Sequence, residues 1–416
     1  MRVLVVGRGG REHAVVQKLL RDGVTEVFAA PGNVGMAPAT LVPIDETDVA
    51  ALADFAQSNQ IDLTIVGPES ALVAGIVDEF QKRGLRIFGP TKAAAQLEGS
   101  KAFAKQIMAK YGIPTAAYAE FTEIAPAITY VREKGLPFVI KADGLAAGKG
   151  VLIPTTLDEA ENTIYEMLSG NAFGESGKRI VIEEFLDGEE FSLMSFVGSD
   201  QNGAIRFEPM PVARDYKRAF DGDQGLNTGG MGAHSPNPRI TDEDTAQAIA
   251  QVVAPTVQAL CDEGIPFTGV LYAGLIKTDD DVKVIEFNVR FGDPETEVVL
   301  PRLETPLVDV ISHVMDNQPN NAQWSDQPAV GVVLATEGYP GDYPKGTPIN
   351  GLDNLNDVEV YHMGTATNAN GDLVSNGGRV LFISAKGNTL QAARAKVYQE
   401  IEKIDAPALF YRTDIG

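Results

Sequence analysis

Residues 284–295 read Val-Ile-Glu-Phe-Asn-Val-Arg-Phe-Gly-Asp-Pro-Glu, a stretch that begins with alternating apolar and polar side chains. Successive side chains of a β-strand point to opposite faces, so Glu286, Asn288 and Arg290 are predicted to share one face, with the apolar residues between them facing a core. A carboxylate and a carboxamide are oxygen ligands suited to a divalent cation that also binds phosphate, and a guanidinium beside them can hold an anion. The stretch therefore favours a metal-and-phosphate site over a solvent-facing strand.

A lysine-bearing strand and a glycine-rich loop lie upstream, at residues 138–151 (Phe-Val-Ile-Lys-Ala-Asp-Gly-Leu-Ala-Ala-Gly-Lys-Gly-Val). Such a loop between two strands can close over a triphosphate with its N–H groups, while Lys141 supplies positive charge. It differs from the Gly-x-x-x-x-Gly-Lys-Ser/Thr loop, because Gly150 and Val151 follow Lys149 and no helix starts there. We interpret the segment as a nucleotide phosphate site.

An acidic segment follows at residues 180–190 (Ile-Val-Ile-Glu-Glu-Phe-Leu-Asp-Gly-Glu-Glu). Backbone groups at Phe185 and Leu186 could face a nucleoside base, and a carboxylate could bind the ribose hydroxyls. An acidic, solvated turn accounts for the same residues equally well, so this segment alone leaves both interpretations open.

The first hundred residues alternate short apolar strands with helices. The predicted strands are Val3–Val6, Val27–Ala30, Leu63–Val66 and Arg86–Phe88, and the predicted helices are Glu12–Arg21, Asp48–Ser58 and Leu72–Lys82. This alternation predicts a doubly wound parallel sheet. A glycine turn follows each strand, and ligands of such sheets bind at the carboxyl ends of the strands. These turns are therefore predicted to form the rim of a ligand site.

The first of these turns, Gly7-Arg-Gly-Gly10, leads into a helix whose free N–H groups can bind an anion. A dinucleotide site is disfavoured for two reasons. Glu12 stands where such sites need a third small residue, and no acid ends the second strand, which reads Ala29-Ala30-Pro31. We therefore predict a phosphate-binding turn and reject hydride transfer.

Composition excludes several other classes of protein. The chain has 416 residues, enough for two to four domains, and a net charge of -23, which argues against a general affinity for nucleic acid or anionic membranes. A single cysteine, Cys261, excludes an internal disulfide, and the scattered histidines show no metal-ligand spacing. No long apolar run and no signal peptide are evident. We expect a cytoplasmic protein that partners neither nucleic acid nor membrane.

The order of these segments resembles the ATP-grasp superfamily, with its lysine strand and glycine loop, acidic hinge strand and Glu-x-Asn strand. More narrowly, the chain is similar from end to end to the glycinamide ribonucleotide synthetase family. The motifs that carry this resemblance are Gly-Gly-Arg-Glu-His (9–13), Pro-Gly-Asn (31–33), Gly-Pro-Glu (67–69), Ile-Lys-Ala-Asp-Gly-Leu-Ala-Ala-Gly-Lys-Gly (140–150), Asn-Thr-Gly-Gly-Met-Gly-Ala (227–233), Arg-Phe-Gly-Asp-Pro-Glu-Thr (290–296) and Asn-Gly-Gly-Arg (376–379).

The resemblance implies an α/β fold with an N-terminal doubly wound parallel sheet domain, a two-part ATP-grasp core and a small C-terminal α+β domain. The implied boundaries are 1–100 for the N-terminal domain, 101–114 with 190–325 for the large ATP-grasp subdomain, 115–189 for the lid subdomain and 326–416 for the C-terminal domain.

The resemblance also implies a reaction. ATP phosphorylates the carboxylate of glycine, and the amine of 5-phosphoribosylamine displaces phosphate from glycyl phosphate, in de novo purine biosynthesis. The implied cofactors are ATP and Mg²⁺ or Mn²⁺, and we expect a monomer. Another ATP-grasp carboxylate–amine ligase is the alternative.

Residue roles follow from the same resemblance, position by position. Arg290 and Lys141 would be catalytic, and Glu286 and Asn288 would ligate the metal. ATP would be bound by Lys101, Lys141, Gly148, Gly150, Glu184, Leu186 and Glu189. Glycine and phosphoribosylamine would be bound by Gly9, Gly10, Gly32, Asn33, Glu69, Asp215, Gly229, Gly230, Met231 and Arg379.

The chain departs from the family pattern at several positions. Arg214-Asp-Tyr-Lys217 stands where relatives commonly have Gln-Asp-His-Lys, Arg8 replaces Asn or Ser, and Glu297 replaces Gln. The strand before Glu-x-Asn reads Tyr272-Ala-Gly-Leu275 and lacks the acid of many ATP-grasp proteins. We therefore expect a metal site with fewer protein ligands.

Overall fold

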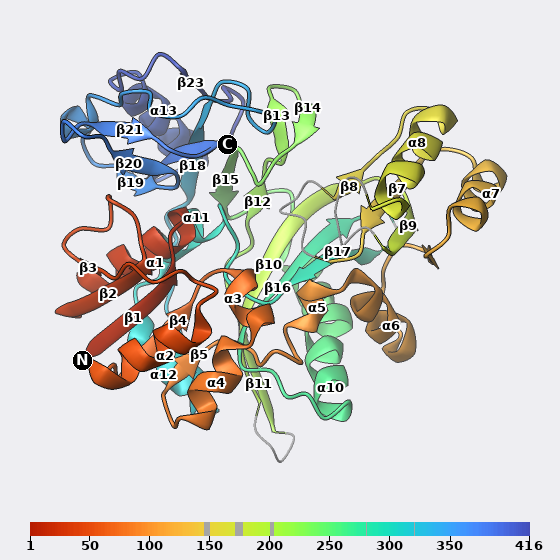
Figure 1. Cartoon of the computed structure of the whole chain (residues 1–416), viewed down its shortest axis with the longest axis horizontal. Helices are drawn as coiled ribbons and strands as arrows, with labels where there is room; N and C mark the ends of the chain where they lie inside the picture. The colour runs from red at the N-terminus through yellow and green to blue at the C-terminus, as the bar shows by residue number, and fades with distance from the viewer. Residues whose placement is uncertain (145–149, 171–177, 200–203, 280, 320) are drawn as a thin grey trace.

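A parallel sheet forms the N-terminal part of the computed structural model, which describes residues 1–144, 150–170, 178–199, 204–279, 281–319 and 321–416. Its strand order is β3-β2-β1-β4-β5 (Figure 1). The strands are β1 (Arg2–Gly7), β2 (Glu26–Pro31), β3 (Thr40–Leu41), β4 (Leu63–Val66) and β5 (Ile87–Phe88). The side chains of Val3–Val6 on β1 are all fully buried because the sheet is covered on both faces. The predicted doubly wound sheet is confirmed.

The helices of this part are α1 (Gly10–Arg21), α2 (Val49–Ser58), α3 (Glu69–Ala74), α4 (Ile76–Lys82) and α5 (Gln96–Gly99). One prediction here was wrong, because Leu72–Lys82 is not a single helix. Gly75 adopts a φ of 95° and ends α3 in a left-handed cap before α4 begins. Glu69 stands in the first turn of the short helix α3.

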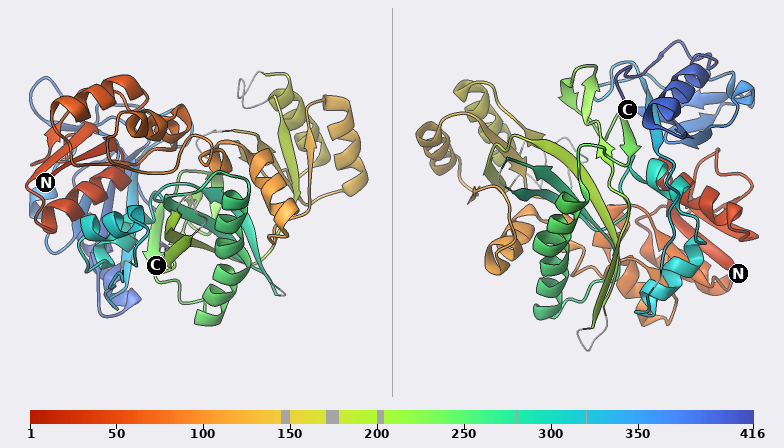
Figure 2. Two further views of the ribbon diagram at one scale, coloured as in Figure 1. Left: turned by 90° about the horizontal axis from the view of Figure 1, so that it is seen from below. Right: turned by 180° about the vertical axis from the view of Figure 1, so that it is seen from behind.

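A small antiparallel sheet in the order β6-β9-β7-β8 projects from the body of the molecule (Figure 2). It comprises β6 (Tyr118–Phe121), β7 (Phe138–Ala142), β8 (Val151–Leu152) and β9 (Ile180–Glu184), with α7 (Ile124–Lys134) and α8 (Leu157–Leu168). Apolar residues of these helices and strands form a core of their own, including Val131, Ile140 and Ile164. We call this unit the lid.

The central sheet has the order β11-β10-β16-β17. Its strands are β10 (Glu189–Ser199), β11 (Ile205–Pro209), β16 (Gly269–Lys277) and β17 (Val282–Asn288), and α6 (Lys101–Tyr111), α9 (Asp242–Ala248) and α10 (Ala254–Asp262) pack against it. A π-helical turn at Ile249–Val253 joins α9 to α10. β10 was not predicted, and it starts directly after Asp187 and Gly188.

The C-terminal sheet has the order β12-β15-β18-β22-β19, with β23 beside β18. It contains β12 (Arg214–Asp215), β15 (Gly232–Ser235), β18 (Ala329–Thr336), β19 (Glu359–His362), β22 (Arg379–Lys386) and β23 (Leu409–Phe410), covered by α13 (Leu390–Ile401). Although β12 and β15 fall within residues 190–325, β15 pairs with β18 of the C-terminal region, and β12 pairs with β15. Asp215 and Arg379 therefore belong to one sheet.

Smaller elements complete the described fold. They are the hairpins β13 (Arg218–Phe220) with β14 (Gln224–Asn227) and β20 (Thr365–Thr367) with β21 (Leu373–Ser375), and the helices α11 (Thr296–Val299) and α12 (Leu307–Met315). Among the residues that the structure describes, no helix has the length and apolar character needed to cross a membrane.

Candidate active site

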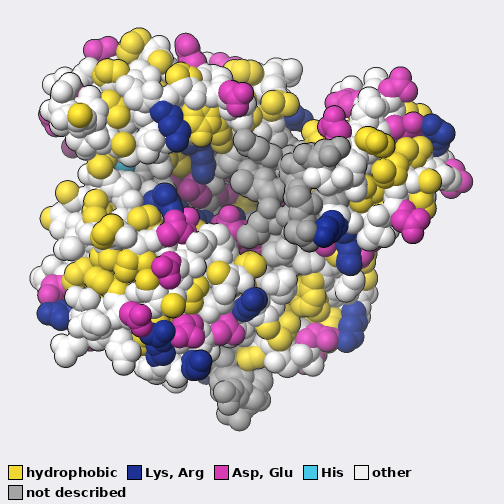
Figure 3. All heavy atoms as spheres, viewed as in Figure 1, with side chains coloured by type: hydrophobic (Ala, Val, Ile, Leu, Met, Phe, Trp, Pro, Cys, Tyr) yellow, Lys and Arg dark blue, Asp and Glu magenta, His cyan; other side chains and the backbone are white. Residues whose placement is uncertain are grey.

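A cavity of about 800 Å³ lies where the N-terminal sheet, the lid, the central sheet and the C-terminal sheet meet. Charged side chains of both signs gather in this recess (Figure 3). Most of the predicted site residues line it: Glu69, Lys101, Lys141, Gly150, Glu184, Leu186, Glu189, Asp215, Gly229, Glu286, Asn288, Arg290 and Arg379. Others do not line it: Gly9, Gly10, Gly32, Asn33, Gly230 and Met231. Gly148 lies outside the described residues.

A β-bulge on β17 shapes the floor of the cavity. Gly274 of β16 pairs with Glu286, but Leu275 pairs with Val284, so Ile285 is an extra residue. The carbonyl of this residue accepts a hydrogen bond from Lys141 Nζ of the lid at 3.0 Å. Ile285 lines the cavity, whereas the sequence pattern placed it in the buried apolar row. Phe287 and Val289 are buried as predicted.

The chain segment at Pro114 and Thr115, which leads into the lid, is bonded to β17 at the edge of the central sheet. Thr115 forms a parallel bridge to Val284, whose N–H donates to the Pro114 carbonyl at 2.9 Å. Thr115 Oγ1 donates to the Val284 carbonyl at 2.8 Å. The segment that leads into the lid is thus bonded directly to the strand that carries the predicted metal ligands.

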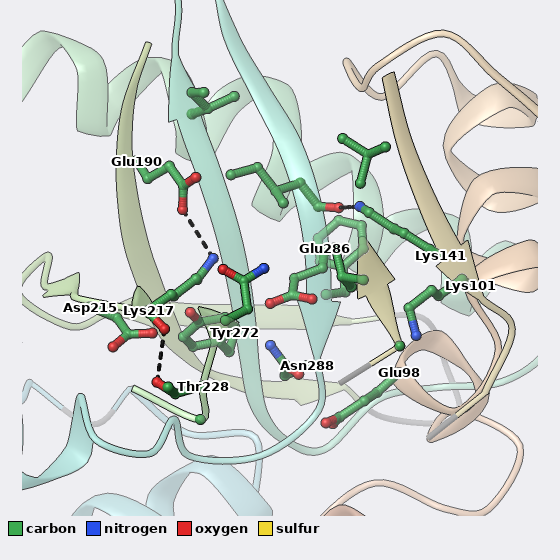
Figure 4. A pocket seen from close by; sticks show the side chains of 18 of the residues that line it. Glu98, Lys101, Lys141, Glu190, Asp215, Lys217, Thr228, Tyr272, Glu286 and Asn288 are labelled. Carbon is green, nitrogen blue, oxygen red and sulfur yellow. Dashed lines mark hydrogen bonds and ion pairs between the residues drawn. The ribbon is translucent and has the colours of Figure 1, made fainter. Parts of the chain in front are cut away.

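Glu286 lies on the floor of the cavity among positive side chains (Figure 4). Burial would raise its pKa, but the nearby Lys217, Lys141, Lys101 and Arg290 lower it below the ordinary value. No hydrogen bond or ion pair to its carboxylate is present among the described residues. Gly274, beside it on β16, has no side chain, and a Cβ there would lie 3.2 Å from Glu286 Cγ. An ionised, unpartnered carboxylate next to Asn288 fits a divalent cation.

Arg290 is held by oxygen atoms from three parts of the chain. Its Nε donates to Glu69 at 3.2 Å, and its Nη2 donates to Glu98 at 2.8 Å and Asn288 at 3.1 Å. Its Nη1 donates to the Phe291 carbonyl at 3.3 Å. A guanidinium has five N–H groups, so one N–H of Nη1 stays available for a ligand.

Glu98 is a site residue that sequence analysis missed. It is buried in α5 and accepts a hydrogen bond from the Val289 N–H at 2.8 Å as well as from Arg290. Burial raises its pKa to about 7, the nearby Glu69 adds to that increase, and Arg290 opposes it. Its partners are about 190 residues away in sequence, so no local pattern indicates its role.

Two lysines share one carboxylate at the lid side of the cavity. Glu183 Oε2 lies 3.1 Å from Lys105 Nζ and 3.0 Å from Lys141 Nζ, and the three side chains are 3–5% exposed. Burial lowers the pKa of Lys105 to about 8, although Glu183 opposes the change. Sequence analysis missed Lys105, which follows the predicted Lys101 by one turn of α6 and therefore shares its face.

Lys101 lies at the start of α6, where the lid also makes contact. Its Nζ donates to the Gly144 carbonyl at 2.9 Å. The adjacent Asp143 accepts hydrogen bonds from Ser100 Oγ at 3.1 Å and the Ala102 N–H at 3.2 Å, so a lid carboxylate caps this helix.

Glu189 and Glu190, the two acids at the start of β10, have different environments. Glu189 is bound by Arg214 at 2.8 Å and by Arg239 at 3.0 Å. Glu190, which sequence analysis did not select, faces Lys217 at 3.0 Å across the cavity wall (Figure 4), and this lysine lowers its pKa. The Arg214 departure from the family pattern therefore has a structural role as the partner of Glu189.

The N-terminal glycine turn is already occupied by a side chain of the protein. The Gly9 N–H donates to Glu12 Oε2 at 2.6 Å, and Arg11 Nε donates to Glu12 Oε1 at 2.6 Å. A methyl group at Gly7 or Gly67 would overlap with the Glu12 side chain. These glycines make room for a buried acid at the start of α1, so the anion-binding role predicted for the turn stays a prediction.

Asn33 and Met231 have structural environments. Asn33 Nδ2 donates to the carbonyls of Arg8 at 2.7 Å and His362 at 2.8 Å, which joins the N-terminal sheet to the C-terminal sheet. Met231 is fully buried in an apolar cluster.

Arg379 lines the cavity on the side formed by the C-terminal sheet. Its Nη1 donates to the Gly229 carbonyl at 2.7 Å and lies 2.8 Å from Asp293 Oδ1. The Gly229 N–H donates to the hydroxyl of Tyr339 at 3.0 Å, another cavity residue that sequence analysis missed. Glu297 is fully buried behind this wall, and burial and Asp293 raise its pKa well above the ordinary value.

Comparison with known proteins gives one consistent answer. Models of the N domain, the ATP-grasp (A) domain and the C domain of phosphoribosylglycinamide synthetase match residues 1–98, 99–296 and 329–416. The phosphoribosylamine–glycine ligase of Halalkalibacterium halodurans is 53% identical over 419 residues, covering 100% of this chain and 96% of the relative.

Solved structures agree with these matches. Phosphoribosylamine–glycine ligase from Thermotoga maritima superposes with a TM-score of 0.86 at 34% identity, with 100% of each chain covered. The biotin carboxylase domain of Hydrogenobacter thermophilus 2-oxoglutarate carboxylase, solved with MgADP, ADP and bicarbonate, superposes with a TM-score of 0.72 at 17% identity, covering 99% of this chain and 91% of that one. The second likeness shows a shared fold alone.

Proposed function

This chain belongs to the phosphoribosylglycinamide synthetase family, and on that premise we propose that it joins glycine to 5-phosphoribosylamine through glycyl phosphate, with ATP converted to ADP and phosphate. The observation that carries the proposal is the meeting of two groups in one cavity. Lysines of the lid and α6 face the row formed by Glu286, Asn288 and Arg290 on and after β17.

ATP would lie between the lid and the central sheet. Lys101, Lys105 and Lys141 would neutralise its phosphates, and the backbone at Glu184–Leu186 with the side chain of Glu189 or Glu190 would hold the nucleoside. Glu189 and Glu190 both line the cavity. Since Glu189 already has two arginine partners, Glu190 is the acid that can exchange Lys217 for ribose hydroxyls.

Transfer of the γ-phosphoryl group to glycine joins two anions, so positive groups must surround the reacting atoms. Arg290 is fixed by Glu69, Glu98 and Asn288 and keeps one N–H that can donate to a ligand. The positive charges of Lys141 and Lys217 lie near Glu286. In the second step the amine nitrogen bonds to the acyl carbon, the C–O bond to phosphate breaks, and the amine loses one proton.

Glu286 and Asn288 would hold a divalent cation, Mg²⁺ or Mn²⁺, and such an ion neutralises phosphate charge when it is bound. The ionised carboxylate without a partner supports this assignment. Among the described residues no cluster of three or more His, Cys, Asp or Glu side chains could hold a metal by itself. Phosphate oxygens would therefore complete the shell, as Mg²⁺ sites commonly require.

The roles of the other predicted substrate residues divide by position. Glu69, Asp215, Gly229 and Arg379 line the cavity and would contact the substrates directly. Gly9, Gly10, Gly32, Asn33, Gly230 and Met231 would act through the backbone that they shape.

Heavy-oxygen transfer tests the mechanism. Glycine labelled with ¹⁸O in its carboxylate should pass one labelled atom to inorganic phosphate at each turnover, with ADP as the nucleotide product. Release of labelled AMP and pyrophosphate would show an adenylate instead. A matched reaction without phosphoribosylamine separates net turnover from reversible phosphorylation.

A further inference from the structure

Two neighbouring acids of the cavity, Asp215 and Glu295, lack a cationic partner. Among the residues that the structure describes, no Lys, Arg or His nitrogen lies within ion-pair distance of Asp215 or Glu295. The other cavity acids Glu69, Glu98, Glu183, Glu189, Glu190 and Asp293 are each paired with lysine or arginine. Asp223 is paired with Arg412, and Glu286 is the predicted metal ligand. Glu184 also lacks a cationic partner, but it is exposed at the end of β9 in the lid, where it accepts a hydrogen bond from the Ala117 N–H at 3.4 Å. Asp215 and Glu295 are thus the two neighbouring acids of the cavity without a counter-ion.

Glu295 is held rigidly. Its Oε1 accepts hydrogen bonds from Ser192 Oγ at 2.7 Å and Tyr272 OH at 2.8 Å, and its side chain is almost fully buried. A Cβ at Gly292 would lie 2.6 Å from Glu295 Oε2, so the bare glycine backbone packs directly on the carboxylate. Both donors are neutral hydroxyl groups, so neither of these hydrogen bonds comes from a cation.

Asp215 is placed against the same wall. Its Oδ1 is buried and has no hydrogen-bond partner, and a Cβ at Gly230 would lie 2.6 Å from that atom. Asp215 and Tyr272 lie side by side in Figure 4. The nearest positive groups, Lys217 and Arg379, are bonded to Glu190 and to Asp293 with Gly229. Burial and the negative charge of Glu295 raise the pKa of Asp215, as expected of two carboxylates that share one dry site.

Tyr272 connects this acid pair to the metal-and-phosphate row. It stands opposite Asn288 in the β16–β17 register, while its hydroxyl binds Glu295. A small molecule that presents a carboxylate to the row at Glu286–Asn288 would therefore place a group on its next carbon near Asp215 and Glu295.

We propose that Asp215 and Glu295 bind the ammonium group of glycine, while its carboxylate faces Glu286, Asn288 and Arg290. The inference rests on the proposed function, because it names the atom of that substrate which these two acids recognise. Two carboxylates around an ammonium keep it protonated and therefore non-nucleophilic. The activated acyl carbon is then open to attack by the amine of phosphoribosylamine, and not by the amine of another activated glycine.

Glycolate tests the proposal, because it replaces the ammonium of glycine by a neutral hydroxyl. Charge-assisted hydrogen bonds lost at a buried site correspond to a weakening of about 10- to 150-fold. In the wild-type protein the inhibition constant of glycolate against glycine should exceed the KM of glycine by at least about 10-fold. In Asp215→Asn and Glu295→Gln the KM of glycine should rise by a similar factor, so that the preference for glycine over glycolate falls towards unity, with the KM of ATP unchanged.

A control variant and the wild-type reaction distinguish failure of the ammonium assignment from failure of the proposed function. Glu208→Gln on β11, outside the cavity, should leave every constant unchanged. If wild-type protein does not consume glycine, the proposed function fails. If it consumes glycine but binds glycolate equally well, or if both variants keep the full preference for glycine, the ammonium assignment is overturned. Should a variant unfold, the wild-type comparison of glycine with glycolate still decides.

Discussion

Glu183→Gln is the variant with the most clearly defined consequence. It removes the one negative charge shared by Lys105 and Lys141 in a region where all three side chains are 3–5% exposed. Removing one partner of a buried ion pair costs about 3–5 kcal/mol, because the remaining charge loses its compensation. Here two ammonium groups lose it together, so we expect a free energy of unfolding lower by at least about 3 kcal/mol at pH 7.

The deficit should depend on pH. Burial has already lowered the pKa of Lys105 to about 8 with Glu183 in place, and without that carboxylate the pKa should fall further. A lysine whose pKa is lowered in the folded state binds fewer protons there than in the unfolded chain, so its destabilising effect is fully present at low pH and diminishes as pH rises. In the wild type the destabilising effect of Lys105 begins to diminish near pH 8. In Glu183→Gln it should begin to diminish below pH 8.

Urea unfolding at pH 7 and pH 9, with calorimetric titration of ATP, measures both effects. The variant should lose less stability at pH 9 than at pH 7, and ATP should bind more weakly because Lys141 is no longer held in position. Glu161→Gln is the matched control, since Glu161 pairs with Arg132 at 2.6 Å on the exposed surface of the lid, and it should behave as wild type. Wild-type stability and ATP affinity in Glu183→Gln would refute this account of the buried lysines.

Three further variants test other parts of the structure. Glu286→Ala should abolish ADP formation while the melting temperature stays within a few degrees of wild type, and turnover near the wild-type rate in excess Mg²⁺ would contradict the metal assignment. Gly67→Ala should lower the free energy of unfolding by about 1–3 kcal/mol, because its methyl overlaps with the buried Glu12. Gly84→Ala is the comparison variant: its Cβ would have open space, and its positive φ of 71°, which Gly67 does not share, gives the cost of backbone strain without overlap. Burial lowers the pKa of His13 to about 3. Between pH 6.5 and about pH 3 the unfolded chain therefore binds a proton at His13 that the folded protein does not, and the folded protein loses stability as pH falls through this range. In His13→Gln the loss between pH 7 and pH 5 should be smaller, and an unchanged slope in acid unfolding curves would count against this origin.

The sequence predicted those parts of the site that depend on local patterns. Side-chain alternation places Glu286 and Asn288 on one face of β17, and the glycine turns mark the carboxyl ends of the N-terminal strands. Glu98 and the Tyr272–Glu295 pair had no such signal, because their partners lie far away in sequence. The bulge at Ile285 adjoins the bridge between Val284 and Thr115, a distant partner that no periodicity within residues 282–288 can show.

Motif membership also failed to separate residues that line the cavity from residues that support it. Met231 stands in the same motif as Gly229 of the cavity wall, yet its side chain is fully buried in an apolar cluster. The motif that contains Asn33 does not reach the cavity, and Asn33 binds backbone carbonyls instead. A loop of fixed shape needs both kinds of residue, so a linear pattern includes both without distinction.

The pairing of β15 with β18 affects how the chain is completed during synthesis. Ser235 pairs with Ala329, a partner that the ribosome makes 94 residues later. At about 5–20 residues per second, β12 and β15 wait roughly 5–20 s for the strand that binds them. During that interval the lid and the central sheet can already form, since their strands precede residue 289. The nucleotide side of the cavity can thus be built while the chain is still growing, and the wall that carries Asp215 and Arg379 is added last.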